Sequence, residues 1–304
     1  MSGAAPRIRR DRVRRTFDRV AAAFATNDFL YREMARRMDE RLDMVRIAPT
    51  RILDAGCGLG ADRLRLGQRY PGATWVGLDL SEGMLYHGRA SEQATQSFLQ
   101  RLFPAGRRAP NSRLAASMDA LPLATHSVDL TWSNAALFWL DDLPAALKEF
   151  NRVLSVGGLL MFSTFGPDTL KQLRDAIRLA GGIARVHDFT DMHDVGDMLV
   201  HAGFSDPVMD METLTLTYAD PWQALQELKQ AGAVSARHAA VAGLTSKAFW
   251  AKVFECWPRD PEGRFPLTFE LIQGHAWKAP PRQHEDGRAV VNFMPRPGQS
   301  SRQD

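Results

Sequence analysis

The sequence predicts an α/β protein with a doubly wound parallel sheet. From Pro49 onward, short apolar runs alternate with stretches of helical length, and a glycine-rich loop follows the first of these runs. Alternation of this kind is typical of parallel strands joined by helical crossovers. The chain has 304 residues, 45% of them hydrophobic, which is enough for one large core in one or two domains.

The amino-terminal part predicts two amphipathic helices. Apolar residues recur at three- to five-residue steps from Arg9 to about Val45, with a break at residues 26–28. Thr26, Asn27 and Asp28 have side chains that can cap the second helix. We therefore expect a helical segment, residues 1–45, ahead of the sheet.

Seven segments have the length and composition of strands. They are Arg51–Asp54, Thr74–Asp79, Arg113–Ala116, Val128–Trp132, Leu159–Thr164, Val208–Tyr218 and Phe265–Trp277. Helices are expected at 61–70, 82–102, 143–154, 168–180 and 193–202, with a helical insertion at 220–256 before the last strand. The main domain is thus 46–278, with an exposed loop at 103–112 and a Pro-, Arg-, Gln- and Gly-rich tail at 279–304 that we expect to be disordered.

Composition argues against several functional classes. Cys57 and Cys256 are far apart, and no histidine is spaced with a carboxylate as metal ligands are, so we expect neither a disulfide nor a metal site. No apolar run reaches about 18 residues, which argues against a membrane span. The formal charge is +3, and its surplus lies near the start, at Arg7, Arg9, Arg10, Arg12, Arg14 and Arg15. This run fits either a solvated helix face or a surface that binds an acidic partner. The sequence has no recognised nucleic-acid-binding motif, so we expect no nucleic-acid partner.

The loop from Asp54 to Gly60 is the main candidate for a ligand site. A strand ends in Asp54, and Gly56, Cys57, Gly58 and Gly60 then lead into a helix. Glycines allow a tight turn and a close approach of backbone to ligand at the carboxyl edge of the sheet. The same spacing also satisfies the dinucleotide-binding pattern, so the glycines alone leave the ligand open.

Charge distinguishes the two ligands. A nicotinamide cofactor would place an anionic pyrophosphate beside Asp54, which is repulsive. S-adenosylmethionine (SAM) has an ammonium and a sulfonium and no phosphate, so Asp54 can attract its methionine end. Asp79 ends the second strand and is followed by Leu80; it can accept both ribose hydroxyl protons, or it can cap the helix that opens at Ser81. The sequence therefore favours SAM.

Two further segments are candidates for the adenine and substrate positions. Met118 can pack on the adenine ring, while Asp119 or Ser117 reaches a polar edge; ordinary loop packing is the alternative. Asn134, after the fourth strand, can orient the substrate or the methionine carboxylate, or can stabilise a turn. Trp139 and Phe138 can shield the methyl group from water or belong to the core.

The motifs together resemble the class I SAM-dependent methyltransferases over about residues 45–165. The resemblance rests on five motifs at 53–60, 78–81, 121–123, 132–134 and 153–158. It implies the seven-stranded methyltransferase sheet and SAM as the cofactor. We then expect the amino-terminal helices around Phe17, Phe24 and Phe29 to fold over the cofactor as a lid.

Four further stretches resemble the BioC family, the malonyl-[acyl-carrier protein] O-methyltransferases of biotin synthesis. These stretches are 162–170, 191–194, 228–233 and 263–269, and the resemblance extends to about Lys278. It implies methylation of the free carboxylate of a malonyl thioester in the cytoplasm. The partner would be the acidic acyl carrier protein. Candidate docking charges are Arg9 to Arg15, Arg36 or Arg37, and Lys229.

Two positions depart from that family and keep other functions open. Phe24 stands where the family usually has a tyrosine, so a substrate-positioning hydroxyl is missing there, and Ser117 replaces an acidic residue of the adenine segment. One alternative is a related methyltransferase with another acceptor. Another is a SAM-binding assembly factor, similar to a mitochondrial complex I assembly factor that hydroxylates an arginine and shares the fold.

Overall fold

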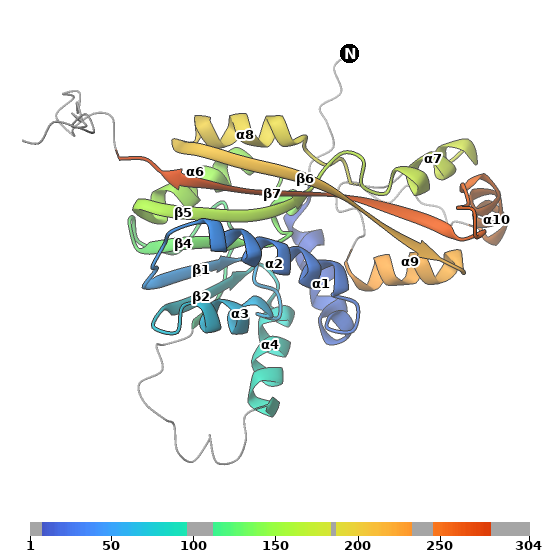
Figure 1. Ribbon diagram of the computed structural model, residues 1–304. Helices are drawn as coiled ribbons and strands as arrows, with labels where there is room; N and C mark the ends of the chain where they lie inside the picture. The colour runs from blue at the N-terminus through green and yellow to red at the C-terminus, as the bar shows by residue number, and fades with distance from the viewer. Residues whose placement is uncertain (1–7, 96–111, 184–186, 233–245, 281–304) are drawn as a thin grey trace, which may run out of the picture.

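The computed structural model describes residues 8–95, 112–183, 187–232 and 246–280, which form a seven-stranded sheet with helices on both faces (Figure 1). The doubly wound α/β prediction is confirmed. The strands are β1 Arg51–Ala55, β2 Thr74–Asp79, β3 Ser112–Ala115, β4 Val128–Ser133, β5 Leu154–Phe165, β6 Phe204–Tyr218 and β7 Phe265–Lys278.

The helices lie close to their predicted positions. They are α1 Arg10–Phe24, α2 Phe29–Arg41, α3 Asp62–Arg69, α4 Glu82–Thr95, α6 Leu143–Val153, α7 Lys171–Leu179, α8 Met192–His201, α9 Pro221–Gln230 and α10 Lys247–Cys256, with short 3-10 turns η1 Leu42–Met44 and η2 Leu137–Trp139. Parts of five predictions lie outside the described residues: 1–7 of the amino-terminal segment, 96–102 of a helix, 103–111 of a loop, 233–245 of the helical insertion and 281–304 of the tail.

Two strands begin earlier than the sequence predicts. β5 starts at Leu154 and not at Leu159, because the strand continues through Gly157 and Gly158 in a register irregularity opposite β4. β6 starts at Phe204 and not at Val208, again with a register shift, this time opposite β7. Bulges of this kind keep a strand in the sheet where its apolar pattern is interrupted.

The strand order is β3-β2-β1-β4-β5-β7-β6. The first five strands are parallel, as expected, and β7 lies antiparallel between β5 and β6. The carboxyl ends of β1, β2 and β4 therefore meet at one edge of the sheet, which is where ligands bind in doubly wound folds.

Alternate residues of the central strands β1 and β5 face two different cores. On one face, Leu53 and Leu160 pack against α6 and α8 in a cluster that includes Phe150 and Leu199. On the other face, Ile52 of β1 joins a cluster with residues of α2 and α3, among them Met38 and Leu66. This double coverage explains why the strands read as nearly continuous apolar runs.

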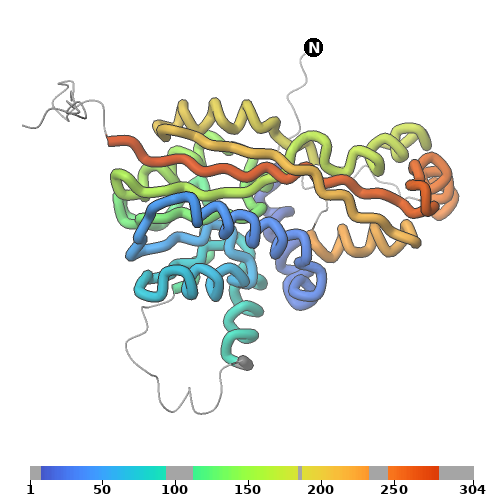
Figure 2. The backbone as a smooth tube through the Cα atoms, in the orientation of Figure 1, coloured from blue at the N-terminus to red at the C-terminus, as the bar shows by residue number. Residues whose placement is uncertain are grey.

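β6 and β7 extend beyond the rest of the sheet and lie side by side along their length (Figure 2). The part of β7 from Phe265 to Glu270 pairs with β6 alone. A third cluster surrounds this extension and contains Leu267, Phe269 and Trp257 together with residues of α7, α9 and α10.

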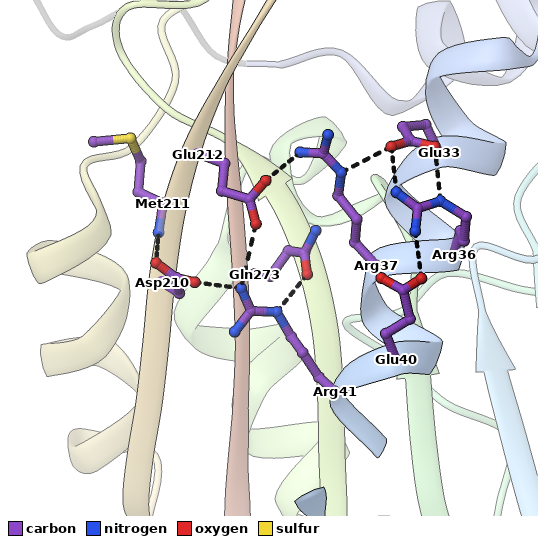
Figure 3. A network of polar contacts seen from close by, with 9 residues as sticks. All are labelled: Glu33, Arg36, Arg37, Glu40, Arg41, Asp210, Met211, Glu212 and Gln273. Atoms are coloured by element: carbon purple, nitrogen blue, oxygen red, sulfur yellow. Dashed lines mark hydrogen bonds and ion pairs between the residues drawn. The ribbon is translucent and has the colours of Figure 1, made fainter. Parts of the chain in front are cut away.

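Charged side chains of helix α2 bond residues of the paired strands β6 and β7 (Figure 3). Arg37 bonds Glu212 on β6, and Arg41 contacts Asp210 on β6 and donates to Gln273 on β7 at 2.6 Å. The second helix is thereby held against the sheet at several points.

The break between α1 and α2 lies where the sequence predicts it, but the predicted cap is wrong. Asp28 occupies the N-cap position of α2 without a side-chain capping bond, because its carboxylate pairs with Arg32 at 2.7 Å. The side chains of Thr26 and Asn27 donate to the carbonyl of Ala23. These two residues therefore complete the end of α1.

Candidate functional site

A cavity of about 310 Å³ opens at the carboxyl ends of β1, β2 and β4, under α1 and the start of α2. This volume is in the range of small-molecule sites. Twelve of the thirteen predicted site residues line it: Phe24, Asp54, Gly56, Cys57, Gly58, Asp79, Leu80, Ser117, Met118, Asp119, Asn134 and Trp139. The structure thus brings these residues together around one cavity, and their roles toward a ligand stay predictions.

The glycine loop has the conformation that its composition suggests. Gly56 has φ +80° and Gly58 has φ +52°, and a Cβ on Gly56 would lie 2.4 Å from that of Ala136. The amides of Gly56 and Cys57 donate to the carbonyl of Leu78 at 2.7 and 3.0 Å. A residue with a side chain would not fit at position 56. Because glycine has none, the backbone of the loop can lie close to a molecule in the cavity.

Gly60, the thirteenth predicted residue, does not line the cavity. A Cβ on it would lie 2.6 Å from the guanidinium of Arg113, which is buried behind the loop. Arg113 donates to the carbonyl of Leu59 at 3.1 Å and pairs with Glu92. Gly60 therefore makes room for an arginine that supports the loop, a role that the sequence pattern did not reveal.

Asp79 makes the capping contact that the sequence predicts, and its role toward a ribose stays a prediction. Its carboxylate accepts from the amide of Gly58 at 2.8 Å and from the amide of Ser81 at 2.7 Å, so it fixes the glycine loop and caps the turn into α4. It also lines the cavity. Burial raises the pKa of Asp79 to about 6 despite these two bonds.

Asp54 is a buried carboxylate with a free acceptor. It is 2% exposed, and among the described residues its Oδ2 has no hydrogen-bond partner. Burial, with the nearby negative charges of Asp62 and Asp79, raises the pKa of Asp54 well above its ordinary value. A buried, unpartnered carboxylate is costly, and a cation in the cavity would relieve that cost.

Asp62 is a site residue that the sequence analysis missed. It is the first residue of α3 and lines the same cavity. Its Oδ2 accepts from Trp132 Nε1 at 2.9 Å and from Asn134 Nδ2 at 3.2 Å. Burial raises the pKa of Asp62, and these two donors oppose the rise. Its position directly after the glycine loop was the available signal.

Asn134 connects three parts of the site. Its amide nitrogen donates to the carbonyl of Tyr31 on α2 at 2.9 Å as well as to Asp62, and its oxygen accepts from Ser163 at 2.7 Å. These contacts match the turn-stabilising alternative, and the direct role of Asn134 toward a ligand stays a prediction.

The segment after β3 forms another wall of the cavity. Met118 is 9% exposed and faces the cavity, while Asp119 pairs with Arg10 of α1. The amide of Ile8 donates to Asp141 at 2.8 Å, a second link between the start of the described chain and the cavity rim.

Aromatic side chains close the cavity on the helical side. Phe17 contacts Phe24 and Trp139, with ring centroids 6.3 and 5.2 Å apart, and Phe24 lies 5.1 Å from the ring of Tyr31. Phe138, in contrast, does not line the cavity and packs on Phe165, so the core alternative holds for it. The sequence analysis missed Tyr31, because nothing in its helical spacing marks it.

Most of the candidate docking arginines have intramolecular partners. Arg36 bonds Glu33 and Glu40, and Arg37 bonds Glu33 and Glu212 (Figure 3). On α1, Arg10 pairs with Asp119, while Arg9 and Arg15 pair with Asp11. These ion pairs hold the arginines within the chain, and the choice between a solvated face and an acidic partner stays a prediction.

Among the described residues, no helix is long and apolar enough to cross a membrane. In the same residues, no group of three His, Cys, Asp or Glu side chains is arranged to hold a metal ion.

The chain is similar to known methyltransferases in sequence and in fold. A family described as "Methyltransferase domain" matches residues 53–162. The malonyl-[acyl-carrier protein] O-methyltransferase of Gallionella capsiferriformans is 44% identical over 280 residues, which cover 92% of this chain and 94% of that protein. The enzyme of the same name from Laribacter hongkongensis is 44% identical over 290 residues, 94% of this chain and 96% of its own.

Among solved structures, the YcgJ protein of Bacillus subtilis superposes with a TM-score of 0.57 at 15% identity, covering 82% of this chain and all of its own. At that identity the likeness concerns the fold alone.

Proposed function

The chain belongs to the malonyl-[acyl-carrier protein] O-methyltransferase family, and from this premise we propose that it transfers the methyl group of SAM to the free carboxylate of a malonyl thioester carried by acyl carrier protein. The product is a methyl ester and S-adenosylhomocysteine. The same membership supports a role in biotin synthesis, in the cytoplasm, with the acidic carrier protein as partner.

The observation that carries the cofactor assignment is the acidic cavity. Asp54, Asp62 and Asp79 all line it, and Oδ2 of Asp54 is buried without a partner among the described residues. These carboxylates suit a ligand with an ammonium, a sulfonium and two ribose hydroxyls, and they would repel a pyrophosphate. The residues present therefore fit SAM.

The cofactor supplies, when bound, a methyl carbon activated by the positive sulfonium. The residues of the chain position the two reactants and exclude water. The substrate carboxylate is ionised at neutral pH, so the chain needs no general base. Opposite charges on the reactants diminish in the transition state, so a tight clamp on the substrate carboxylate would slow the step.

We propose that α1 and α2, within residues 1–45, act as the lid. Phe17 and Phe24 of α1 lie over the cavity against Trp139, and their rings keep water from the reacting atoms. Main-chain and side-chain contacts of Ile8 and Arg10 with the cavity rim hold this helix in place.

The test is methyl transfer from labelled SAM to purified malonyl-[acyl-carrier protein]. We expect a labelled methyl ester with the malonyl thioester and none with the acetyl thioester, which lacks the free carboxylate. Tight cofactor binding without any ester would refute the proposal. It would favour a SAM-binding assembly protein, or a methyltransferase with another acceptor.

Phe24 separates the acceptor alternatives. Its ring contacts Tyr31, which also lines the cavity and whose hydroxyl donates to the carbonyl of Ala231 at 2.8 Å. If the malonyl thioester is the acceptor, Phe24→Tyr should retain its methylation. If another acceptor is used, Phe24→Tyr should create no malonyl activity.

A further inference from the structure

We infer that Asp62, together with Asp54, binds the α-ammonium group of the methionine portion of SAM, and that Asn134 is a positioning residue that orients Asp62 for this contact. The inference deepens the proposed function and rests on its cofactor, but it is independent of the methyl acceptor. It assigns a role to a carboxylate that lies outside the glycine pattern itself.

The position of Asp62 suits a contact with the methionine end. It directly follows the glycine loop, as the first residue of α3, and it shares the cavity with Asp54 of β1. The ribose-binding candidate Asp79 belongs to the neighbouring strand β2. In the cavity, the carboxylate proposed to bind the ribose therefore comes from β2, whereas the two carboxylates proposed to bind the ammonium come from β1 and α3.

The orientation of the Asp62 side chain is fixed by two donors. Trp132 Nε1 and Asn134 Nδ2 both donate to Oδ2, at 2.9 and 3.2 Å. Trp132 is fully buried in β4, and Asn134 is held in turn by Ser163. A carboxylate that is held in this way can present its remaining acceptor sites to a ligand without first losing side-chain freedom.

The charge around the pair calls for a cation. Within the described part of the chain, neither Asp54 nor Asp62 forms an ion pair, and Arg113 and Arg65 act on them only without direct pairing. By contrast, Asp18 on α1 and Asp39 on α2 each pair with an arginine. Oδ2 of Asp54 also lacks any hydrogen bond there. Two carboxylates with this environment stay close only if a positive ligand or a shared proton offsets their repulsion.

The ammonium matches these acceptors better than the sulfonium does. An ammonium has three N–H donors, and carboxylate oxygens accept only from such donors. A sulfonium has none, so it can gain from the negative field but cannot satisfy the unpartnered oxygen of Asp54. The amino group is therefore the part of SAM that the pair selects.

The same network links the ammonium site to the lid. The two hydrogens of Asn134 Nδ2 serve Asp62 and the carbonyl of Tyr31 in α2. A ligand that draws Asp62 toward itself thus acts on a side chain that also holds the lid helix.

The test compares two ligands that differ in the amino-acid part. S-adenosylhomocysteine has the ammonium, whereas 5′-methylthioadenosine has the same nucleoside and sulfur without it. By calorimetry, Asp62→Asn should weaken binding of S-adenosylhomocysteine about 10- to 100-fold and change that of 5′-methylthioadenosine less than about twofold. The control Asp194→Asn makes the same chemical change on α8, where the side chain is exposed, and should alter neither.

An equal loss for both ligands, or an unchanged affinity for S-adenosylhomocysteine, would overturn the inference. A second measurement does not depend on the variant being folded: the wild-type protein should bind S-adenosylhomocysteine at least about tenfold more tightly than the analogue in which hydrogen replaces its amino group. Equal wild-type affinities would also overturn it. Neither measurement uses a malonyl substrate, so a failure of the acceptor assignment would leave both results unaffected.

Discussion

The carboxylate of Asp18 on α1 accepts a hydrogen bond from the hydroxyl of Ser81, 2.6 Å away, at the start of α4. The amide of Gly83 donates to the same oxygen at 2.9 Å. Asp18 of α1 thus caps α4, the helix that follows β2, and this connects the position of α1 to the wall of the cavity.

Removal of this connection should loosen the lid. In Asp18→Ala, the two donors at the start of α4 lose a charged acceptor, and we expect S-adenosylhomocysteine to bind about tenfold more weakly. Tryptic cleavage within α1 should also become faster. Asp11→Ala is the matched control, since Asp11 contacts only arginines of its own segment, Arg9 and Arg15. If both variants are cleaved alike, Asp18 does not hold the lid.

Asp54→Asn should stabilise the ligand-free protein while impairing binding. The folded-state pKa of Asp54 is raised above its ordinary value of 3.8, so its favourable contribution to stability is complete below that value and is lost as the pH rises through the raised pKa. The asparagine side chain of the variant does not ionise, so at pH 7 the variant does not lose this contribution to stability. Thermal unfolding should show a Tm higher by about 2–4 °C for each kcal/mol gained, and calorimetry a weaker cofactor affinity. A lower Tm would contradict the electrostatic account.

Cofactor affinity should depend on the ionisation of Asp79. Its pKa is raised to about 6, and only the ionised form can accept from both ribose hydroxyls while retaining its bonds to Gly58 and Ser81. The affinity for S-adenosylhomocysteine should therefore fall as the pH decreases through about 6. In Asp79→Asn the affinity should be low and this pH dependence should disappear. A pH dependence that persists in the variant would assign it to another group.

Arg113→Met should destabilise the fold and the glycine loop together. The Arg113 side chain is 4% exposed and pairs with Glu92, so its loss leaves a partly buried carboxylate with less compensation. We expect a decrease of about 2–3 kcal/mol in the free energy of unfolding, measured in urea. Arg63 also pairs with Glu92, at 3.0 Å, but is 28% exposed. Arg63→Met should cost less than about 1 kcal/mol, and equal losses would contradict the role of Arg113.

The sequence was sufficient to predict the fold and the residues on the glycine-loop side of the cavity. Strand lengths, helix spacing and the glycines report local constraints, and these placed Asp54, Asp79 and Asn134 at one edge of the sheet. The first residues of β5 and β6 were not predicted as strand, because both strands contain a bulge near their start, at Gly157 and near Asp206. Such a bulge depends on pairing with the neighbouring strand, which the sequence of one strand does not encode.

Residues brought in by tertiary contacts were harder to predict. Arg113 has an unremarkable position in its strand, and the only sequence signal for Asp62 was its place directly after the glycine loop; the contacts of both follow from burial beside that loop. Likewise, the charge pattern of Arg36 and Arg37 does not distinguish a docking surface from the ion pairs that the two side chains make with Glu33 and other acidic groups. Only the folded arrangement decides between these alternatives.

The long β6–β7 ladder has a consequence for folding cooperativity. Its inner part contributes Phe204 and Ala276 to the core under α6 and α8, and its outer part contributes Leu267 and Phe269 to the cluster around α7, α9 and α10. Because β6 and β7 run without a break through both clusters, unfolding of one cluster exposes the end of the β6–β7 pairing that the other covers. The cluster around α7, α9 and α10 and the core under α6 and α8 should therefore unfold in a single transition.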